Sequence, residues 1–289
     1  MRILGVGIAT LDIVNVVDGY PEEDAEIRAL SQRVLRGGNV TNTLVVLSQL
    51  GYQCSWAGEI SDDASSKLIR DDLNFFRINM DNVAVEENST TPTSYVTLNQ
   101  KNGSRTIVHY RQLGEYNYQH FKLIDFSEFD WIHFEGRNVG ELTKMMDFLI
   151  SQNYRNFSLE VEKHRQGIEA LFTLPALLIF SRAYVRDVHV GGVKDFFEDL
   201  TADDINVPAY CSWGKSGAWA MDVDGKLHQQ PAYNPEKVVD TLGAGDVFNA
   251  AVIDATLRNE AIDSILKYAC KVSGLKCGQY GFDHIKDLV

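Results

Sequence analysis

Cysteine is scarce in this chain, and its spacing argues against a metal or disulfide framework. The four cysteines among the 289 residues are Cys54, Cys211, Cys270 and Cys277. They form no Cys-x-x-Cys pair and have no histidines at zinc spacing, which indicates reduced thiols in a cytoplasmic protein. No apolar run reaches the roughly 18 residues of a membrane span, and the apolar N-terminal run is too short for a signal peptide. We therefore expect a cytoplasmic protein with no membrane partner.

Positive charge is also in short supply. The chain has 27 Lys and Arg against 40 Asp and Glu, a formal net charge of −13 and a pI near 4.9. This balance disfavours a nucleic-acid partner or an anionic membrane. If the ligand is a nucleotide, its positive contacts must be local, so individual arginines and lysines carry information.

The order of the periodic segments predicts an α/β fold. Short apolar runs at 3–9 and 177–180 are typical of buried parallel strands, and segments of helical periodicity at 40–50 and 62–77 lie between strands. This alternation favours a doubly wound, mostly parallel sheet flanked by helices. Because the chain has no repeats or obvious linkers, we expect one domain over 1–289.

A hairpin interrupts this alternation. Residues 95–99 and 104–110 alternate in polarity around Asn102-Gly103, a dipeptide typical of tight hairpin turns. With the loosely alternating stretch at 27–36, they predict a small sheet outside the main one, over approximately 27–36 and 94–111.

The most informative stretch is Asp240-Thr241-Leu242-Gly243-Ala244-Gly245-Asp246, a loop that opens a helix predicted over 247–258. Without Cβ atoms, Gly243 and Gly245 let backbone N–H groups converge on an anion at the positive end of that helix. A carboxylate beside an anion needs a reason, and Asp246 could take the proton from an attacking hydroxyl. The alternative is a tight turn with an Asp N-cap.

Polar residues near the N-terminus suit an uncharged ligand rich in hydroxyls. Gly38, Asn39 and Asn42 lie in a Gly-Gly-Asn-x-x-Asn segment at a helix start, and amides both donate to and accept from hydroxyls. Asp12 follows the strand predicted over 3–9, and open α/β sheets bind ligands at the carboxyl ends of strands. The alternatives are helix capping by Asn39 and turn formation by Asp12.

Two common nucleotide motifs are absent. Gly5 and Gly7 lack the third glycine of a dinucleotide fingerprint, and Gly214-Lys215-Ser216 lacks the upstream glycine of a Walker A loop, because residue 209 is Ala.

Other charged residues are weaker candidates for phosphate or metal binding. Arg105 in the hairpin and Arg182 after the strand at 177–180 could bind phosphate, although an arginine is more often solvated. Glu160 and Glu162 alternate in a strand predicted over 157–163, so they would point the same way and could reach Mg²⁺ through water. A solvent-facing glutamate is the alternative.

Both motifs resemble a known family. The loop at 240–246 matches the Asp-Thr-x-Gly-Ala-Gly-Asp signature of the ribokinase-like (PfkB) carbohydrate kinases, and the Gly-Gly-Asn segment about 200 residues earlier matches their N-terminal signature. Trp-Ile-His-x-Glu-Gly-Arg-Asn, from residue 131, and Glu-Val-Glu-Lys, from residue 160, resemble the ketohexokinase subgroup. The resemblance spans nearly the whole chain and is weakest over 171–210.

This resemblance implies an ATP-dependent sugar kinase that converts D-fructose to fructose 1-phosphate. Asp246 would be the catalytic base, with Gly243, Ala244 and Gly245 forming the anion hole. The residues implied in sugar binding are Asp12, Gly38, Asn39 and Asn42. Those implied in nucleotide binding are Arg105, Arg182, Gly214, Gly217, Gly243, Gly245 and Cys277.

The resemblance also implies partners and cofactors. The small sheet would be a lid over the sugar, and in ketohexokinase-like members it clasps a second subunit, so we expect a homodimer. The cofactors would be ATP and Mg²⁺, with a K⁺ requirement left open. Residues 181–184 lack the Asn-x-x-Glu motif that organises magnesium in many members, which leaves the metal ligands unassigned. Alternatives are a kinase of another sugar or a nucleoside, or a non-catalytic sugar or nucleotide sensor.

Overall fold

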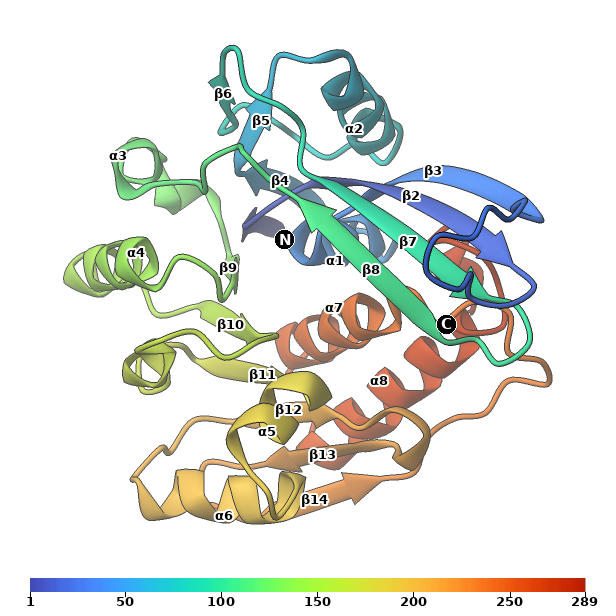
Figure 1. Ribbon diagram of the computed structural model, residues 1–289. Helices are drawn as coiled ribbons and strands as arrows, with labels where there is room; N and C mark the ends of the chain where they lie inside the picture. The colour runs from blue at the N-terminus through green and yellow to red at the C-terminus, as the bar shows by residue number, and fades with distance from the viewer. Residues whose placement is uncertain (289) are drawn as a thin grey trace.

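The computed structural model describes residues 1–288, and its centre is a sheet of eight strands in the order β14-β13-β12-β11-β10-β9-β1-β4 (Figure 1). From β4 to β12 in that order neighbouring strands are parallel, and β13 and β14 add antiparallel pairs at one edge. The strands are β1 Arg2–Val6, β4 Gln53–Ala57, β9 Trp131–Glu135, β10 Phe157–Val161, β11 Leu177–Ser181, β12 Ala209–Ser212, β13 Ala218–Met221 and β14 Leu227–Gln230. The predicted doubly wound, mostly parallel sheet is confirmed.

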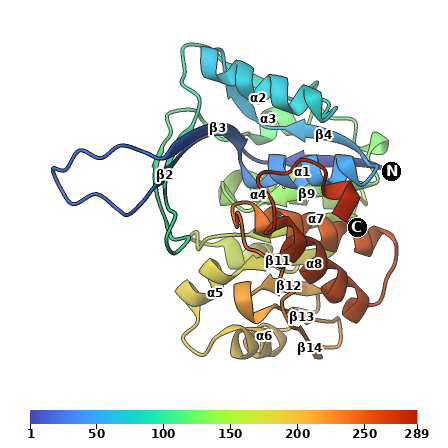
Figure 2. The same cartoon turned by 90° about the vertical axis from the view of Figure 1, so that its right-hand side faces the viewer.

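Helices cover both faces of this sheet. Side chains of α1, α2, α7 and α8 join one hydrophobic cluster, and those of α3, α4, α5 and α6 join a second (Figures 1 and 2). The helices are α1 Asn39–Gln49, α2 Ala64–Phe75, α3 Tyr118–Phe121, α4 Val139–Ser151, α5 Arg182–Val188, α6 Val193–Ala202, α7 Ala244–Leu257 and α8 Ile262–Lys276. Short 3-10 turns lie at Phe126–Glu128, Ile168–Leu171, Gly214–Ser216 and Ile285–Leu288. No helix within residues 1–288 is long and apolar enough to cross a membrane.

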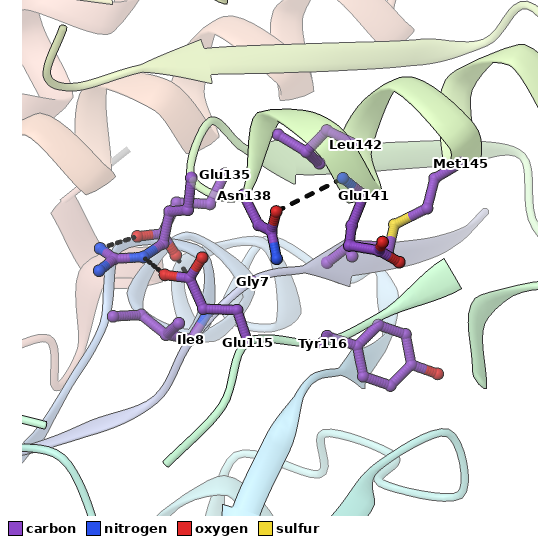
Figure 3. Close-up of a pocket in the computed structure, with 11 residues that line it drawn as sticks. Gly7, Ile8, Glu115, Tyr116, Glu135, Asn138, Glu141, Leu142 and Met145 are labelled. Atoms are coloured by element: carbon purple, nitrogen blue, oxygen red, sulfur yellow. Dashed lines mark hydrogen bonds and ion pairs between the residues drawn. The ribbon is translucent and has the colours of Figure 1, made fainter. Parts of the chain in front are cut away.

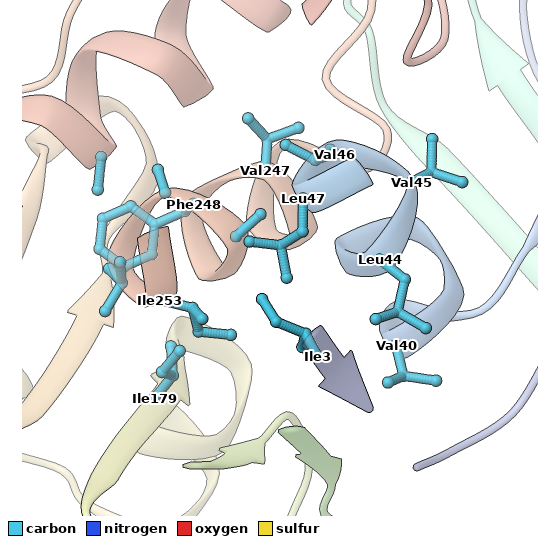
Figure 4. Close-up of a cluster of buried hydrophobic side chains, with 14 of the residues drawn as sticks. Ile3, Val40, Leu44, Val45, Val46, Leu47, Ile179, Val247, Phe248 and Ile253 are labelled. Carbon is cyan, nitrogen blue, oxygen red and sulfur yellow. The ribbon is translucent and has the colours of Figure 1, made fainter. Parts of the chain in front are cut away.

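The strand sequences explain why two clusters form. In β11, Leu177 and Ile179 join the first cluster and Leu178 and Phe180 join the second, because successive side chains of a strand alternate. Strands covered on both faces have no polar side and read as continuous apolar runs. α7 packs against both α1 and α8 and is buried from residue 246 to residue 255 (Figure 4). The glycine-rich loop therefore leads into a helix anchored in the core.

A smaller sheet of order β3-β2-β7-β8 is separate from the main one (Figure 2). Its strands are β2 Thr10–Val17, β3 Ser31–Gly37, β7 Thr93–Asn99 and β8 Arg105–Tyr110. β7 and β8 form the predicted antiparallel hairpin, and Gly103 in its turn has a φ of 69°. A short parallel pair joins β5 Glu59–Ser61 to β6 Ala84–Glu86.

The smaller sheet differs from the expectation in two ways. β3 begins at Ser31, so residues 27–30 are loop. The predicted strand at 3–9 ends at Val6, and Asp12 lies inside β2 rather than after a strand of the main sheet. β2 escaped prediction because its apolar residues do not alternate cleanly, since both of its faces are partly covered.

Candidate active site

The glycine-rich loop ends where α7 begins, three residues before the predicted start. Gly243 is the N-cap, with a φ of 76°, and Ala244, Gly245 and Asp246 form the first turn. A Cβ at Gly243 would stand 2.2 Å from Cζ of Phe282, whereas a Cβ at Gly245 would meet no atom within 4 Å. The loop is thus packed on its Gly243 side and open at Gly245, at the helix end that attracts anions.

Asp246 is a buried carboxylate at this helix N-terminus, with 8% of the residue exposed. Its Oδ2 accepts a hydrogen bond of 2.6 Å from Asn42 Nδ2. Burial raises the pKa of Asp246 to about 8; Glu162 and Glu135 add to the rise, and Asn42 and Arg36 oppose it. A carboxylate with a pKa near neutrality is suited to accept a proton during a reaction.

Arg36, just before the Gly-Gly-Asn segment, orients the partner of Asp246. Its side chain is 2% exposed, and its Nε donates to Asp72 Oδ2 at 2.5 Å. Its Nη1 donates to Asn42 Oδ1 at 2.6 Å and to Thr41 Oγ1 at 3.1 Å. With its oxygen held in this way, the Asn42 amide turns its NH₂ group toward Asp246. An Arg-Asn-Asp chain therefore links the smaller sheet, through α1, to α7.

Glu160, in β10, is a second buried carboxylate of this site. Its Oε1 accepts a hydrogen bond of 3.0 Å from Asn39 Nδ2, and its Oε2 has no hydrogen-bond partner among the described residues. Burial raises the pKa of Glu160 well above its usual range, and the charges of Asp246 and Glu135 raise it further. Buried carboxylates whose charges raise one another's pKa either share a proton or need a cation beside them.

Glu135 ends β9 and lines a small pocket (Figure 3). Its Oε2 accepts a bond of 3.1 Å from the Ile8 backbone N–H, and its Oε1 lies 3.2 Å from Arg137 Nη1. Arg137 also pairs with Glu115 at 2.8 Å. Burial raises the pKa of Glu135. The pocket, of about 20 Å³, admits a water-sized group and not a sugar. A larger cavity of about 350 Å³ near α5 and α6 contains no predicted site residue.

Asp12 reaches the site from the smaller sheet. Its Oδ1 accepts a bond of 2.9 Å from Thr10 Oγ1, and a Cβ at Gly37 would stand 2.3 Å from its Oδ2. Burial raises the pKa of Asp12, and the charge of Arg36 opposes the rise, as it does for Asp246. Gly38 is the N-cap of α1, with a φ of 107°. The structure therefore brings two of the predicted sugar-binding residues, Asp12 and Asn42, close to Arg36, and bonds a third, Asn39, to Glu160.

Three of the predicted nucleotide-binding residues lie beyond the carboxyl ends of β11 and β12 in the main sheet. Arg182 follows β11 and Gly214 follows β12; a Cβ at Gly214 would stand 2.8 Å from Arg182 Nη1. Gly217, with a φ of 93°, packs against backbone, because a Cβ there would stand 1.9 Å from the Gln230 carbonyl oxygen. The turn from β12 to β13 thus requires glycine at 217 whether or not a nucleotide binds.

The last two predicted nucleotide contacts have different surroundings. The Cys277 carbonyl accepts the backbone N–H groups of Val239 at 2.7 Å and Asp240 at 3.2 Å, so this residue lies beside the glycine-rich loop. Arg105 begins β8 and is exposed, and its side chain forms no hydrogen bond or ion pair within the described residues. The structure does not bring Arg105 into the group around Asp246.

No closed metal site is assembled. Within residues 1–288, no three His, Cys, Asp or Glu side chains are placed to hold a metal ion together. β10 ends at Val161, two residues before the end of the strand predicted over 157–163. Beyond the effect of burial, the charge of Glu162 raises the pKa values of both Asp246 and Glu160, so Glu162 stays a candidate for Mg²⁺ beside Glu160. Glu160 is buried, whereas Glu162 lies beyond the strand, 3.6 Å from Lys163 Nζ. The unpartnered Glu160 Oε2 still fits Mg²⁺, which proteins hold through one or two carboxylates plus water and phosphate.

Sequence reasoning missed three side chains that the structure places in or beside the site: Arg36, Glu135 and Lys276. A basic residue directly before the Gly-Gly-Asn segment, and a carboxylate ending an apolar strand, were signals for the first two. Lys276 carries no comparable signal, because most lysines are exposed.

A proton-accepting carboxylate beside a glycine-lined helix N-terminus, with amides that suit hydroxyls around it, is the chemistry of phosphoryl transfer to an alcohol. The chain belongs to the PfkB carbohydrate kinases: the family model described as pfkB family carbohydrate kinase matches residues 2–287. It is an ATP-dependent sugar kinase, and the resemblance inferred from its motifs is confirmed.

Relatives support this membership over the full chain. The protein is 36% identical over 293 residues to ketohexokinase from Mus musculus, covering 98% of each chain. It is 24% identical to an ATP-dependent ribose-1-phosphate kinase from Halopiger xanaduensis, covering 97% of this chain and 93% of that one. The structure of Arabidopsis thaliana ribokinase complexed with ribose and ATP matches with a TM-score of 0.79 and 19% identity, covering 99% of this chain and 98% of that one. This last match establishes the ribokinase-like fold.

Proposed function

We propose that this enzyme transfers the γ-phosphoryl group of ATP to the 1-hydroxyl of D-fructose, giving fructose 1-phosphate. The observation that carries the proposal is the 36% identity to mouse ketohexokinase over 98% of both chains. The charge of the site supports an uncharged sugar. Arg36, the cation beside Asp12, is 2% exposed and already bonded to Asp72. It is not available to pair with the carboxylate of a sugar acid.

In the proposed reaction, Asp246 takes the proton of the 1-hydroxyl as that oxygen attacks the γ-phosphorus. The bond from the γ-phosphorus to the bridging oxygen breaks, and ADP leaves. The amides of Gly243 and Gly245 stabilise the negative charge of the transferring group at the N-terminus of α7, together with that of Ala244, whose N–H also donates to the Thr241 carbonyl at 3.3 Å. Asn42 holds Oδ2 of the carboxylate, so Oδ1 remains to accept the proton.

The sugar and the nucleotide would lie side by side at the carboxyl ends of the parallel strands. Asp12, Gly38, Asn39 and Asn42 are proposed to bind sugar hydroxyls. Among the described residues, the Asn39 amide keeps its oxygen free beyond its bond to Glu160, and the Asn42 amide keeps the second hydrogen of its NH₂ group. The residues proposed for the nucleotide are Arg182, Gly214, Gly217, Gly243, Gly245 and Cys277, joined by Arg105 if the smaller sheet closes as a lid. Strand order supports this division, because β9 and β10 separate β1, which precedes the sugar-binding residues in the chain, from β11 and β12, which precede Arg182 and Gly214.

We propose Mg²⁺ as the metal that accompanies ATP, with Glu160 as the residue that helps to hold it. The unpartnered oxygen of this buried carboxylate, next to Asp246 and Glu135, supports a cation there. The ion would neutralise part of the negative charge of the ATP phosphates.

A coupled assay of ADP release tests the substrate. We expect turnover with D-fructose, ATP and Mg²⁺, and a product that NMR shows to be phosphorylated at carbon 1. The panel includes D-ribose, ribose 1-phosphate, D-glucose, a keto-sugar acid and adenosine, and kcat/KM for D-fructose should exceed each by at least about tenfold. Preference for ribose or ribose 1-phosphate would contradict the proposed substrate. Sugar binding without any turnover would favour a sensor.

We also propose that two copies associate through the smaller sheet. Strand registers place Val34, Ile13, Tyr95 and Val108 side by side as a row across all four strands. Val34, Tyr95 and Val108 are 45%, 50% and 66% exposed. A contiguous exposed apolar face marks an interaction site. A second copy would present the same row, as a two-fold symmetric interface requires.

Sedimentation equilibrium tests this association. We expect wild-type protein to have twice the chain mass of 32.5 kDa. Val108→Glu should weaken the dimer at least about tenfold, because burying an unpaired carboxylate costs several kcal/mol. The matched control is Leu123→Glu, at a residue that is 78% exposed and lies outside the sheet, and it should stay dimeric. Wild-type protein that is monomeric at micromolar concentration would refute the proposed interface.

A further inference from the structure

Lys276 is a buried lysine for which the reaction described above has no use. It is the last residue of α8, and none of its side chain is exposed. Taking an ammonium group out of water is unfavourable unless its hydrogens are bonded and its charge is balanced. Its partners therefore show what this position is built to hold.

Those partners belong to the glycine-rich loop. The Nζ atom donates to the carbonyl oxygen of Asp240 at 2.9 Å and to that of Leu242. The Asp240 carboxylate Oδ2 lies 3.8 Å away. The centroid of the Phe282 ring is 5.7 Å from Nζ, within the range at which an aromatic face attracts a cation. Two carbonyls, a carboxylate and an aromatic ring thus surround one ammonium group.

These contacts fix the direction of the Gly243 amide. A trans peptide unit is planar and its N–H points opposite to its C=O, and no cis peptide is present among the described residues. Because the Leu242 carbonyl faces Lys276, the Gly243 N–H of the same unit faces away from it. The Leu242 N–H bonds Asp240 Oδ1 at 2.9 Å, which closes the turn before Gly243. Phe282, the ring near Nζ, also packs on Gly243.

We propose that Lys276 is a positioning residue whose ammonium group acts as a built-in cation. It holds residues 240–243 so that the Gly243 N–H faces the transferring phosphoryl group, and no monovalent metal ion is required at these carbonyls. The proposal rests on the anion-hole role proposed for this loop. Carbonyl oxygens are the ligands with which proteins replace the water around K⁺. The ammonium group occupies that place, so a K⁺ ion and Lys276 cannot be bound there together.

The test compares wild-type protein with Lys276→Met and with Lys271→Met, a control at an exposed lysine of the same helix. Methionine keeps the apolar length and removes the charge. The values of kcat and KM are measured in KCl, NaCl, NH₄Cl and choline chloride at equal ionic strength, with the best sugar of the wild type. Wild type and the control should be insensitive to the salt. In choline chloride, Lys276→Met should lose about 100-fold in kcat with little change in KM for the sugar. K⁺ or NH₄⁺ should restore part of that loss.

A second measurement needs no sugar. The affinity for ADP with aluminium fluoride, a mimic of the transferring phosphoryl group, is measured by calorimetry. It should fall in Lys276→Met and remain unchanged in Lys271→Met. This measurement tests the role of Lys276 independently of the proposed substrate. If the wild type phosphorylates no sugar, the substrate proposal fails, but the affinity for the phosphoryl mimic still tests Lys276.

Three results would overturn the proposal. The first is a loss of wild-type activity in choline chloride that K⁺ reverses. This result does not depend on the folding of any variant. Another is folded Lys276→Met with wild-type kcat in choline chloride. The third is an unchanged affinity of that variant for the phosphoryl mimic.

Discussion

Asp246→Asn should lower kcat about 1,000-fold, the typical contribution of a general base. The amide cannot accept a proton, but its oxygen can still take the hydrogen bond from Asn42, so the site keeps its shape. Binding of sugar and ATP should be retained. The coupled ADP-release assay gives kcat, and calorimetry gives the two affinities. A variant with near-normal kcat would show that Asp246 is not the base.

The raised pKa of Asp246 predicts the pH profile and provides a check on folding. Because the base acts deprotonated, kcat/KM of the wild type should rise with pH through about 8, and this limb should vanish in the variant. Between pH 3.8, the ordinary pKa of an aspartate, and about pH 8, folded protein binds more protons than unfolded protein. The free energy of unfolding therefore falls as pH rises across that window. Asparagine puts no buried charge in this place. The melting temperature of Asp246→Asn at pH 8 should therefore be no lower than that of the wild type.

Asp254→Asn is the matched control for the loss of the carboxylate. Asp254 lies on the same helix and is 6% exposed, but it accepts a hydrogen bond of 2.9 Å from Tyr52 and lies outside the loop. We expect this variant to lose stability and to keep kcat. If both variants lost kcat equally, damage to α7 would explain the result better than loss of a base.

Much of the fold could be predicted because single strands carry their own signals. The run Leu177-Leu178-Ile179-Phe180 is apolar on both faces, and a strand covered by helices on both sides requires this. Asn102-Gly103 likewise marks its hairpin. The path of β2 was not predictable, because local pattern does not show where a chain leaves one sheet for another. Asp12 was therefore expected at a strand end, yet it lies in the smaller sheet.

The site was predictable where chemistry is local and not where it depends on contacts between distant segments. Gly243 and Asp246 stand in one string, so their roles could be inferred together. Which side chain bonds Asp246 could not, because Asn42 lies 204 residues away. Arg36 is only six residues before Asn42, but it is linked to Asp246 only through that distant contact of Asn42, and Glu160 is buried only because β10 is central. Such residues need the structure before a role can be inferred for them.

Gly243→Ala should both destabilise the fold and disable the loop. The residue has a φ of 76°, and its Cβ would stand 2.2 Å from Cζ of Phe282. Left-handed backbone strain and overpacking together predict a loss of about 3 kcal/mol in the free energy of unfolding. Because any relief must move the loop that contains the amides, kcat should fall about 100-fold. Chemical denaturation and the coupled assay measure the two effects.

Two other glycines separate the causes. Gly51→Ala has similar strain, with a φ of 100°, but its Cβ meets nothing within 4 Å, so it should lose only about 1 kcal/mol and keep kcat. Gly245→Ala adds a methyl group on the open side of the loop, so it should keep its stability and lose kcat/KM for ATP. Adding Phe282→Ala to Gly243→Ala should recover only part of the lost stability, since it removes the clash and leaves the left-handed strain. If Gly243→Ala were instead as stable and active as wild type, Phe282 would not constrain the loop, and the amides would have to be positioned by other contacts.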